Sequence, residues 1–217
     1  MSNSLDSLFH NSIPDFPADT PSGTRVEKEM SNKSQLVRRG VLAKPCDANI
    51  RCKEESHLPL RFTQLCANEE IILDPTDGLK TIAQADDVFE SGIDPDFTNW
   101  NLDVPAQPTK ATKVSLYQMS EGDGTFAEIF GGFGYPLEDI CLTQHQNIDF
   151  CMKHKDKLRH SNLGTFSLFK VGDKFVVTHI RMFTGGELYV YAFPFSPNNL
   201  VWHAWTQPCF VIPTQEQ

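Results

Sequence analysis

The chain has 217 residues, of which 40% are hydrophobic, and it carries 16 phenylalanines and a net charge of −9. This composition supplies enough apolar material for one domain with a substantial core. No stretch approaches the roughly 18 consecutive apolar residues that a membrane helix needs, and the first residues lack the basic region and apolar stretch of a secretory signal. We therefore expect a soluble cytoplasmic protein that has no membrane partner.

The charge is unevenly distributed along the chain. Residues 1–55 balance to zero, whereas residues 56–149 hold four basic and sixteen acidic side chains. Residues 150–174 reverse the sign, with six basic and two acidic side chains. An acidic surface repels a phosphate backbone, so the composition disfavours nucleic-acid binding over most of the chain. The six cysteines are widely spaced, which indicates free thiols in a reducing compartment rather than a disulfide scaffold.

Residues 1–55 predict a flexible N-terminal tail. They are rich in Ser, Asn, Pro, Asp and Lys and show no sustained apolar period. Basic residues such as Arg38 and Arg39 are candidates for contact with a nucleic acid or with a partner protein. A solvated tail is the simpler interpretation, and we adopt it.

Residues 56–104 predict a hairpin followed by a short helix. Two apolar runs in EEIILDPTDGLKTI flank an Asp-Gly pair, which is a strong hairpin signal, and AQADDVFES is typical of one or two helical turns. The stretch DPDFTNWNLD is rich in aspartate, but it lacks the central Gly and terminal Glu of an EF-hand loop, so we predict no calcium site there. Residues 105–113 contain two prolines and predict a linker.

The stretch from Val114 to Arg159 predicts a helix, a glycine-rich turn and a second helix. The turn contains the letters GGFG, but no lysine follows, and neither phosphate-binding glycine pattern is present. We therefore interpret these glycines as the end of the TFAEIF helix and as a tight turn.

From Ser161 onward the apolar period changes to two, which indicates strands. TFSLFKV and KFVVTHIRMF flank Gly172-Asp173, a two-residue hairpin loop. Further strand-like runs follow in GGELYVYAFPF, LVWHAW and CFVIP. Short connections favour antiparallel pairing of neighbouring strands, so residues 114–213 predict two helices packed on an antiparallel meander of about five strands. The expected fold class is α+β.

The stretch CLTQHQNIDFCMKH brings two cysteines and two histidines close together in sequence. Thr143 and Gln146 match a capping box, so we expect a helix to begin there. His145 and His154 would then lie on opposite sides of the helix and about 13 Å apart along its axis, which excludes one zinc site formed by all four residues.

Two smaller alternatives remain for this stretch. Cys141 and His145 could form a catalytic pair near the helix N-terminus, where the helix dipole lowers a thiol pKa. Cys151 and His154 could bind a metal together with a histidine from elsewhere, such as His179 or His203. A buried cysteine under a capped helix is the favoured interpretation, and we assign neither a catalytic nor a metal residue.

The basic end of the same helix gives a set of candidate binding residues: Lys153, Lys155, Lys157 and Arg159. They could contact phosphates, although cations are also favoured at a helix C-terminus. Trp202 and Trp205 are further binding candidates, provided that they face solvent. No RNA-binding sheet motif is present, so Phe175, Tyr189, Tyr191 and Trp202 are more simply interpreted as core residues or cross-strand pairs.

Several motifs from Ile71 to Pro213 resemble a group of uncharacterised proteins of uncultured candidate-phylum bacteria. The likeness rests on TDGLKTIAQADDVFESGIDPDFTNWNLD, on TFAEIFGGFGYPLEDICLTQHQNIDFCMKH, on TFSLFKVGDKFVVTHI and on a VW pair before FVIP. The resemblance implies no activity and no catalytic residue. It implies that residues 71–104 and 114–213 belong together, and that the N-terminal tail lies outside the shared part.

The sequence contains no complete catalytic or cofactor motif, so we expect no cofactor. The favoured function is a non-catalytic protein-binding or accessory module whose partner is another protein. One alternative is a nucleic-acid-associated protein that uses the tail and the 153–159 cluster. Another is a cysteine-dependent hydrolase or transferase that uses Cys141 and His145.

Overall fold

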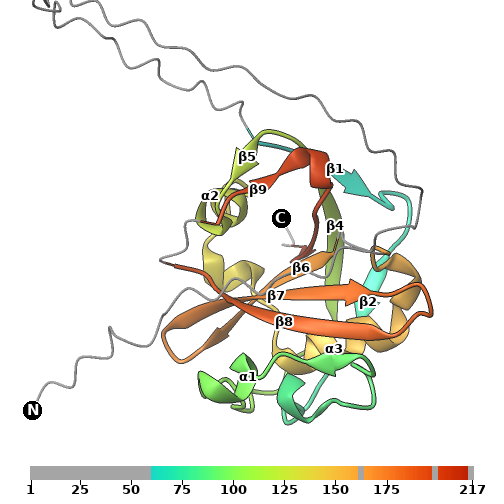
Figure 1. Ribbon diagram of the computed structural model, residues 1–217, viewed down its shortest axis with the longest axis vertical. Coiled ribbons are helices and arrows are strands. Elements are labelled where there is room, and N and C mark those ends of the chain that lie inside the picture. The colour runs from blue at the N-terminus through green and yellow to red at the C-terminus, as the bar shows by residue number, and fades with distance from the viewer. Residues whose placement is uncertain (1–59, 161–163, 197–199, 215–217) are drawn as a thin grey trace, which may run out of the picture. The chain divides into compact units, whose positions relative to one another are not determined.

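A computed structural model describes residues 60–160, 164–196 and 200–214 (Figure 1). The predicted tail of residues 1–55 lies outside the described residues. Within them, one large mixed sheet is accompanied by short helices, so the fold is α+β as expected. The sheet has eight strands in the order β1-β4-β10-β6-β7-β8-β3, with β2 also paired to β4, and a two-stranded sheet joins β5 and β9.

The described helices and strands have the following bounds. The strands are β1 Arg61–Leu65, β2 Ile71–Leu73, β3 Gly92–Ile93, β4 Thr112–Glu121, β5 Asp123–Gly124, β6 Thr165–Val171, β7 Lys174–Met182, β8 Leu188–Pro194, β9 Trp202–His203 and β10 Cys209–Pro213. The α-helices are α1 Asp96–Asn99, α2 Phe126–Gly131 and α3 Gln144–Lys153. The short 3-10 helices are η1 Ile82–Gln84, η2 Leu137–Ile140, η3 Lys155–Lys157 and η5 Ala204–Thr206.

The meander was predicted correctly only for its first three strands. β7 pairs antiparallel with both β6 and β8, its neighbours along the chain. The predicted two-residue loop at Gly172 connects β6 to β7, with Val171 opposite Lys174. The five-strand meander is wrong beyond that point. β10 returns between β4 and β6, antiparallel to β4 and parallel to β6, while β9 leaves the main sheet and pairs with β5.

The first predicted helix is also wrong in its N-terminal half. Thr112–Glu121 form β4, a ten-residue strand between β1 and β10, and only Phe126–Gly131 are helical. Val114 and Leu116 face one side of the sheet, whereas Tyr117 and Met119 contact the core on the other side. Because both faces carry apolar side chains, the alternation that marks a half-exposed strand is missing from the sequence.

The hairpin predicted in residues 69–82 does not form. β2 pairs with β4 instead of folding back on the residues that follow it. Gly78 does adopt a positive φ of 76°, as an Asp-Gly turn requires, and its carbonyl accepts a hydrogen bond from Ala106 N at 2.9 Å. The turn therefore directs the chain toward the predicted linker rather than into a second strand.

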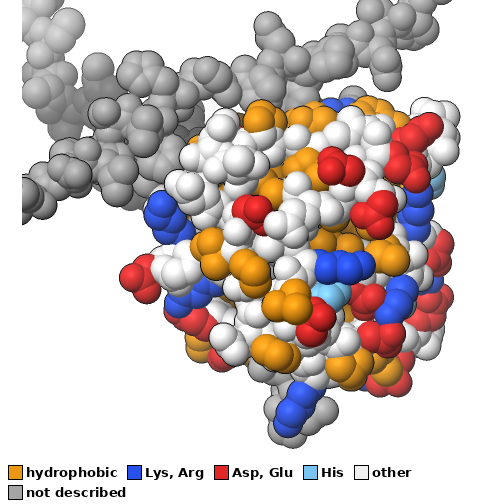
Figure 2. All heavy atoms as spheres, turned by 90° about the horizontal axis from the view of Figure 1, so that it is seen from below, with side chains coloured by type: hydrophobic (Ala, Val, Ile, Leu, Met, Phe, Trp, Pro, Cys, Tyr) orange, Lys and Arg blue, Asp and Glu red, His pale blue; other side chains and the backbone are white. Residues whose placement is uncertain are grey.

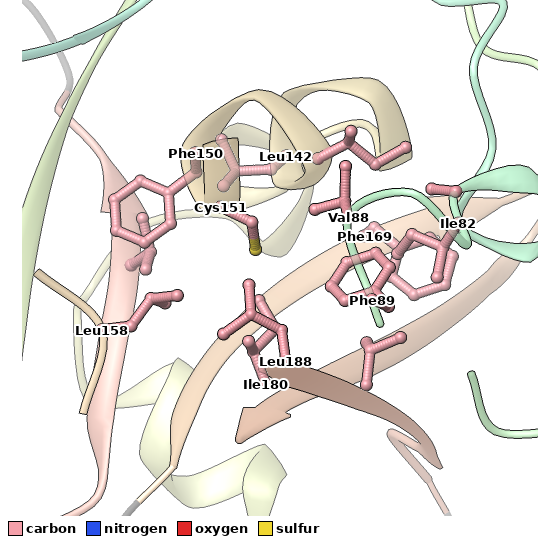
Figure 3. Close-up of a cluster of buried hydrophobic side chains, with 14 of the residues drawn as sticks. Ile82, Val88, Phe89, Leu142, Phe150, Cys151, Leu158, Phe169, Ile180 and Leu188 are labelled. Carbon is pink, nitrogen blue, oxygen red and sulfur yellow. The ribbon is translucent and has the colours of Figure 1, made fainter. Parts of the chain in front are cut away.

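Two apolar cores lie on the two faces of the sheet. α3, α1 and η1 cover one face. There Cys151 points toward Ile180 and Leu188 of the sheet, whereas the Phe150 ring lies on the side of Leu158 (Figure 3). α2 and η2 cover the other face and contribute Phe126 among other residues. Successive side chains of each central strand point alternately into the two cores. The sequences of these strands are therefore nearly continuous apolar runs.

The helix α3 begins as predicted. Thr143 Oγ1 accepts a hydrogen bond from Gln146 N at 3.1 Å, and Gln146 Oε1 accepts one from Thr143 N at 2.9 Å. A second capping box, which we did not predict, starts α2 with Thr125 and Glu128. In the parts of the chain given above, no helix is long and apolar enough to cross a membrane.

Candidate functional site

A pocket of about 280 Å³ lies where the second core ends, on the sheet face that carries α2. Its floor is formed by β1, β4 and the end of β10, and its wall is the loop between α2 and η2. The residues around it are Phe62, Ser115, Tyr117, Gly132, Phe133, Tyr135, Ile212, Pro213 and Thr214. We call this the aromatic pocket.

The glycine-rich loop shapes the wall of the aromatic pocket. A Cβ at Gly132 would lie 3.3 Å from Phe62 Cε2, so the absence of a side chain lets the Phe62 ring lie against the end of α2. Gly134 has a φ of 76°, a left-handed conformation that favours glycine. These two glycines place the half-buried Phe133 inward, whereas Tyr135 stands at the rim with 42% of its surface exposed.

The aromatic rings of the pocket are held by the core behind them. Phe62 and Phe133 stack with ring centroids 4.4 Å apart, and Tyr117 lies 5.2 Å from Phe133. Phe133 and Phe62 also contact the buried ring of Phe210, at 6.3 Å and 6.1 Å. Because these rings come from separate elements and pack on one another, the pocket wall is preorganised rather than a loose surface loop.

The polar groups at the pocket are uncharged. Gln64 Nε2 donates a hydrogen bond to Ser115 Oγ at 3.2 Å, and Ser115 Oγ lies 3.1 Å from Thr214 Oγ1. Among the described residues, no Asp, Glu, Lys, Arg or His lines the pocket. A ligand that suits this site has an apolar face for the rings and few polar groups, and it carries no charge at the contact.

The predicted basic cluster is partly neutralised by carboxylates. Lys153 pairs with Asp74 and with Asp149, and Lys157 pairs with Glu69 and Asp156. These contacts raise the pKa of both lysines, so the two cations are stabilised by the protein's own acidic groups.

The other two cations of the cluster do not extend it into a phosphate-binding surface. Lys155 is half-buried at the start of η3, and the half-buried Arg159 donates a hydrogen bond to Gln118. On the face that is seen from below in Figure 1, basic side chains alternate with acidic and apolar ones (Figure 2). Neither observation gives the continuous basic surface that binding of a phosphate backbone favours.

The two predicted tryptophans face in different directions. Trp202 packs inside the second core, with ring centroids 4.7 Å from Phe166 and 5.6 Å from Phe126. Trp205 is 79% exposed and stacks on His203, whose Nδ1 lies 3.1 Å from Asp123 Oδ1. Of the two tryptophans, only Trp205 therefore faces solvent, which was the condition for its being a binding candidate.

The predicted cysteine-histidine pair is not assembled as a nucleophile and base. The Cys141 thiol donates a hydrogen bond to Leu137 O at 3.1 Å, and burial raises its pKa to about 12. His145 Nδ1 instead lies 3.0 Å from Asp77 Oδ1, and no hydrogen bond joins His145 to Cys141 in the described part of the chain. The expectation that a helix dipole activates this thiol is therefore not met.

The alternative metal ligands are also separated. Cys151 is buried in the first core, and His154 Nε2 lies 3.2 Å from Ile72 O. His179 is buried in the second core against Phe166. Over residues 60–160, 164–196 and 200–214, no group of three or more His, Cys, Asp or Glu side chains is placed to hold a metal ion.

Sequence reasoning missed the aromatic pocket. The usable signal was the stretch FGGFGYP, in which aromatic residues alternate with glycines. We interpreted these glycines as a helix end and a tight turn, without expecting the turn to present aromatic rings. Its other walls come from positions that are distant in sequence, such as Phe62 and Ile212, and these could not be joined to the loop without the sheet order.

Comparisons of the chain with models of protein families, with curated proteins and with solved structures gave no match.

Proposed function

We propose that this protein is a non-catalytic protein-binding module and that the aromatic pocket accepts one uncharged apolar side chain from a segment of a partner protein. The observation that carries the proposal is the wall of packed rings around a pocket without charged residues. Buried pockets lined by aromatic residues are typical of the anchor positions of protein interfaces.

The size of the pocket favours a side chain over a whole cofactor. Its volume is about 280 Å³, just below the roughly 300–1,000 Å³ of small-molecule sites. A single side chain with its flanking backbone fits such a space, and the rest of the partner would lie on the surface around it.

The strand at the edge of the sheet supports an extended partner. β1 supplies Phe62 to the pocket and pairs with β4 on one side, and among the described strands it is the end of the sheet order. An edge strand of this kind leaves backbone donors and acceptors available to an extended segment. The pocket and the edge therefore offer side-chain and main-chain contacts to the same partner.

The cysteines support the non-catalytic part of this proposal and a cytoplasmic location, which we propose as well. Cys66, Cys141, Cys151 and Cys209 are all free, and the last two are buried. Burial raises the pKa of the Cys209 thiol to about 11, so this group is also protonated near neutral pH. Free, buried thiols are typical of proteins in a reducing compartment.

Nucleic-acid binding through the 153–159 cluster has less support, because carboxylates of the same chain already neutralise Lys153 and Lys157. A phosphate would have to displace these carboxylates. Binding of this kind would also be steeply salt-dependent.

Peptide selection followed by affinity measurement tests the proposal. Random extended peptides are selected for binding to the full chain, and their affinity is measured by fluorescence polarisation for wild type, Tyr135→Ser and Trp205→Ser. We expect Tyr135→Ser to weaken binding at least about tenfold, because it removes the ring at the pocket rim, and Trp205→Ser to leave affinity unchanged.

Three results would overturn the proposal. One is that no peptide is enriched. Another is that the selected peptides bind Tyr135→Ser as tightly as wild type. The third is that binding depends on Trp205 instead of Tyr135, which would assign the interaction to the exposed surface of η5.

A further inference from the structure

We infer that a second surface of this protein binds a short basic segment of a partner protein, in which an apolar side chain lies between lysine or arginine residues. The surface consists of the exposed Leu79 and Val104 together with the neighbouring carboxylates of Asp77 and Asp103, and we call it the acidic patch. It belongs to the chain between β2 and β4 and shares no residue with the aromatic pocket. The inference is therefore independent of the proposed function.

The acidic patch lies where two parts of the chain run side by side. Gly78 O accepts a hydrogen bond from Ala106 N at 2.9 Å, and Thr81 Oγ1 donates a hydrogen bond to Asp103 Oδ1. These two contacts enclose both apolar residues of the patch, which are therefore neighbours although they are distant in sequence. The fold thus holds the two side chains next to each other.

The two apolar side chains of the patch point to solvent, while their backbones are fixed. Leu79 is 64% exposed and Val104 is 47% exposed. Leu79 N donates a hydrogen bond to Asp77 Oδ1 at 3.0 Å, and Val104 O accepts one from Gln144 Nε2 at 3.3 Å. Contact with a partner would remove this apolar surface from water without the cost of ordering a loop, which favours binding.

Negative charge is concentrated in the part of the chain that carries the patch. Residues 74–109 contain eight acidic residues and one basic residue, Lys80, which gives a net charge of −7 in a chain whose total is −9. The side chain of Asp77 is 63% exposed, and Asp103 is exposed as well, so a partner cation can reach both. On the side of α1, apolar side chains lie next to acidic ones (Figure 2). Such a surface attracts basic groups over a Debye length of about 8 Å.

The turn after η1 adds carboxylates that the protein itself does not neutralise. Val88 and Phe89 are buried in this turn, whereas Asp86, Asp87 and Glu90 are exposed. None of these three carboxylates forms an ion pair with another of the described residues. This part of the chain therefore keeps the negative charge that selects a basic partner, unlike the 153–159 cluster, in which two lysines are already paired.

Other occupants fit the acidic patch less well. A second copy of this chain, with its net charge of −9, and a phosphate backbone are both anionic, so the patch would repel them. No three His, Cys, Asp or Glu side chains in residues 60–160, 164–196 and 200–214 are placed to hold a metal ion. An uncharged apolar segment would cover the apolar pair but would desolvate the carboxylates without giving them a partner. A basic segment with one apolar residue satisfies both parts of the patch.

NMR titration of the ¹⁵N-labelled full chain tests the inference. The probe is the blocked peptide acetyl-Arg-Lys-Leu-Lys-Arg-amide, and two matched peptides replace the leucine with serine or every basic residue with glutamate. We expect the probe to give saturable shifts of the amides of Leu79, Lys80 and Val104. The serine peptide should bind at least about tenfold more weakly, and the acidic peptide should not bind. Raising the salt concentration from about 50 to about 500 mM should weaken binding of the probe at least about tenfold.

Three variants locate the contact. Leu79→Ser changes an exposed side chain and should weaken binding of the probe at least about tenfold. Asp77→Asn combined with Asp103→Asn removes two charges but keeps an oxygen acceptor for each internal hydrogen bond, and it should weaken binding at least about fivefold. The matched control, Asp173→Asn combined with Glu187→Gln, removes two charges from exposed turns outside the patch and should change affinity by less than about twofold. The dispersion of the free spectra shows that each variant is folded.

Three outcomes would overturn the inference. One is that the probe gives no saturable shifts of the amides of the patch. Another is that the serine peptide binds as tightly as the probe, because the apolar pair then plays no part. The third is that both double variants weaken binding equally, which would reduce the interaction to the overall charge of the chain. Each of these outcomes leaves the proposed function standing, because that function is tested through Tyr135 at the aromatic pocket.

Discussion

The rings of Phe166 and His179 stack almost parallel, with centroids 4.4 Å apart and planes 6° from each other. His179 is only 2% exposed, and neither of its ring nitrogens has a hydrogen-bond partner in the described part of the chain. Burial, with a smaller contribution from the charge of Arg181, lowers the pKa of His179 to about 3. The imidazole therefore serves as a neutral aromatic ring of the second core.

This neutral histidine predicts that stability falls in mild acid. In the unfolded chain the imidazole takes up a proton near pH 6.5, whereas in the folded protein it stays neutral down to about pH 3. Between these values the unfolded state binds more protons, so the free energy of unfolding decreases as the pH falls, by up to about 1.4 kcal/mol per pH unit. The stabilisation that comes from keeping His179 neutral is fully present above pH 6.5. Urea unfolding measured on both sides of this value checks the decrease.

Two variants assign that pH dependence to His179. His179→Phe keeps an aromatic ring but removes the titrating group, so its stability should vary less with pH. Phe166→Leu removes the stacking partner but keeps the imidazole, so it should lower stability and retain the wild-type slope. If the free energy of unfolding of His179→Phe depends on pH as steeply as that of the wild type, groups other than His179 cause the loss of stability in mild acid.

Gly164 should tolerate no side chain. A Cβ at this position would lie 2.0 Å from His179 Nε2, and the residue has a left-handed φ of 59°. We expect Gly164→Ala to lower the free energy of unfolding by about 2 to 4 kcal/mol, because steric overlap and backbone strain add. A Cβ at Gly131 would meet no atom within 4 Å, so Gly131→Ala should change stability by less than about 1 kcal/mol. Equal melting temperatures for the two variants would contradict this prediction.

The parts of the fold that follow from short-range rules were predictable from the sequence. The capping box at Thr143 and the two-residue loop at Gly172 each depend on residues that are neighbours in the chain, and both are observed. β4 was misread because it carries apolar side chains on both faces, and the place of β10 in the sheet depends on pairing with β4, a strand far from it in sequence. Such long-range pairing leaves no local pattern.

The candidate site was less predictable for the same reason. The pocket is lined by residues from four separate segments, among them Phe62, Tyr117, Phe133 and Ile212. Of these segments, only the FGGFGYP loop has a composition that stands out in the sequence. The sequence did indicate which residues bear charges or thiols, but not whether a lysine meets a carboxylate or a cysteine is buried. Those contacts decide the chemistry of Lys153 and Cys141.

Gln144 should be a critical link between α3 and the segment that contains η1 and α1. Its Oε1 accepts a hydrogen bond from Ile82 N at 3.1 Å, and its Nε2 donates to Leu102 O at 2.7 Å and to Val104 O at 3.3 Å. Gln144→Ala removes the acceptor of the buried Ile82 amide and a donor to the Leu102 and Val104 carbonyl groups, so we expect a loss of about 2 to 3 kcal/mol in the free energy of unfolding.

Hydrogen exchange adds a local measurement to this prediction. The Ile82 amide should exchange faster in Gln144→Ala than global destabilisation alone explains, because its acceptor is missing. Gln84→Ala is the matched control, since Gln84 is exposed and its side-chain amide donates a hydrogen bond to the Asp103 carboxylate at 3.3 Å. A protected Ile82 amide in Gln144→Ala would show that another group replaces the side chain.

The Cys141 thiol should react slowly in the folded protein. With a pKa raised to about 12, it holds roughly three orders of magnitude less thiolate near neutral pH than a free cysteine of pKa about 8.5. We expect iodoacetamide to leave Cys141 unmodified in the native chain and to label it after unfolding in urea, as measured by mass spectrometry of the peptides. The buried Cys151 provides a matched protected thiol, because burial also raises its pKa. Labelling of native Cys141 at the rate of free cysteine, with Cys151 still protected, would contradict the half-buried, hydrogen-bonded geometry of the Cys141 thiol. It would restore the cysteine-dependent hydrolase or transferase as a candidate function.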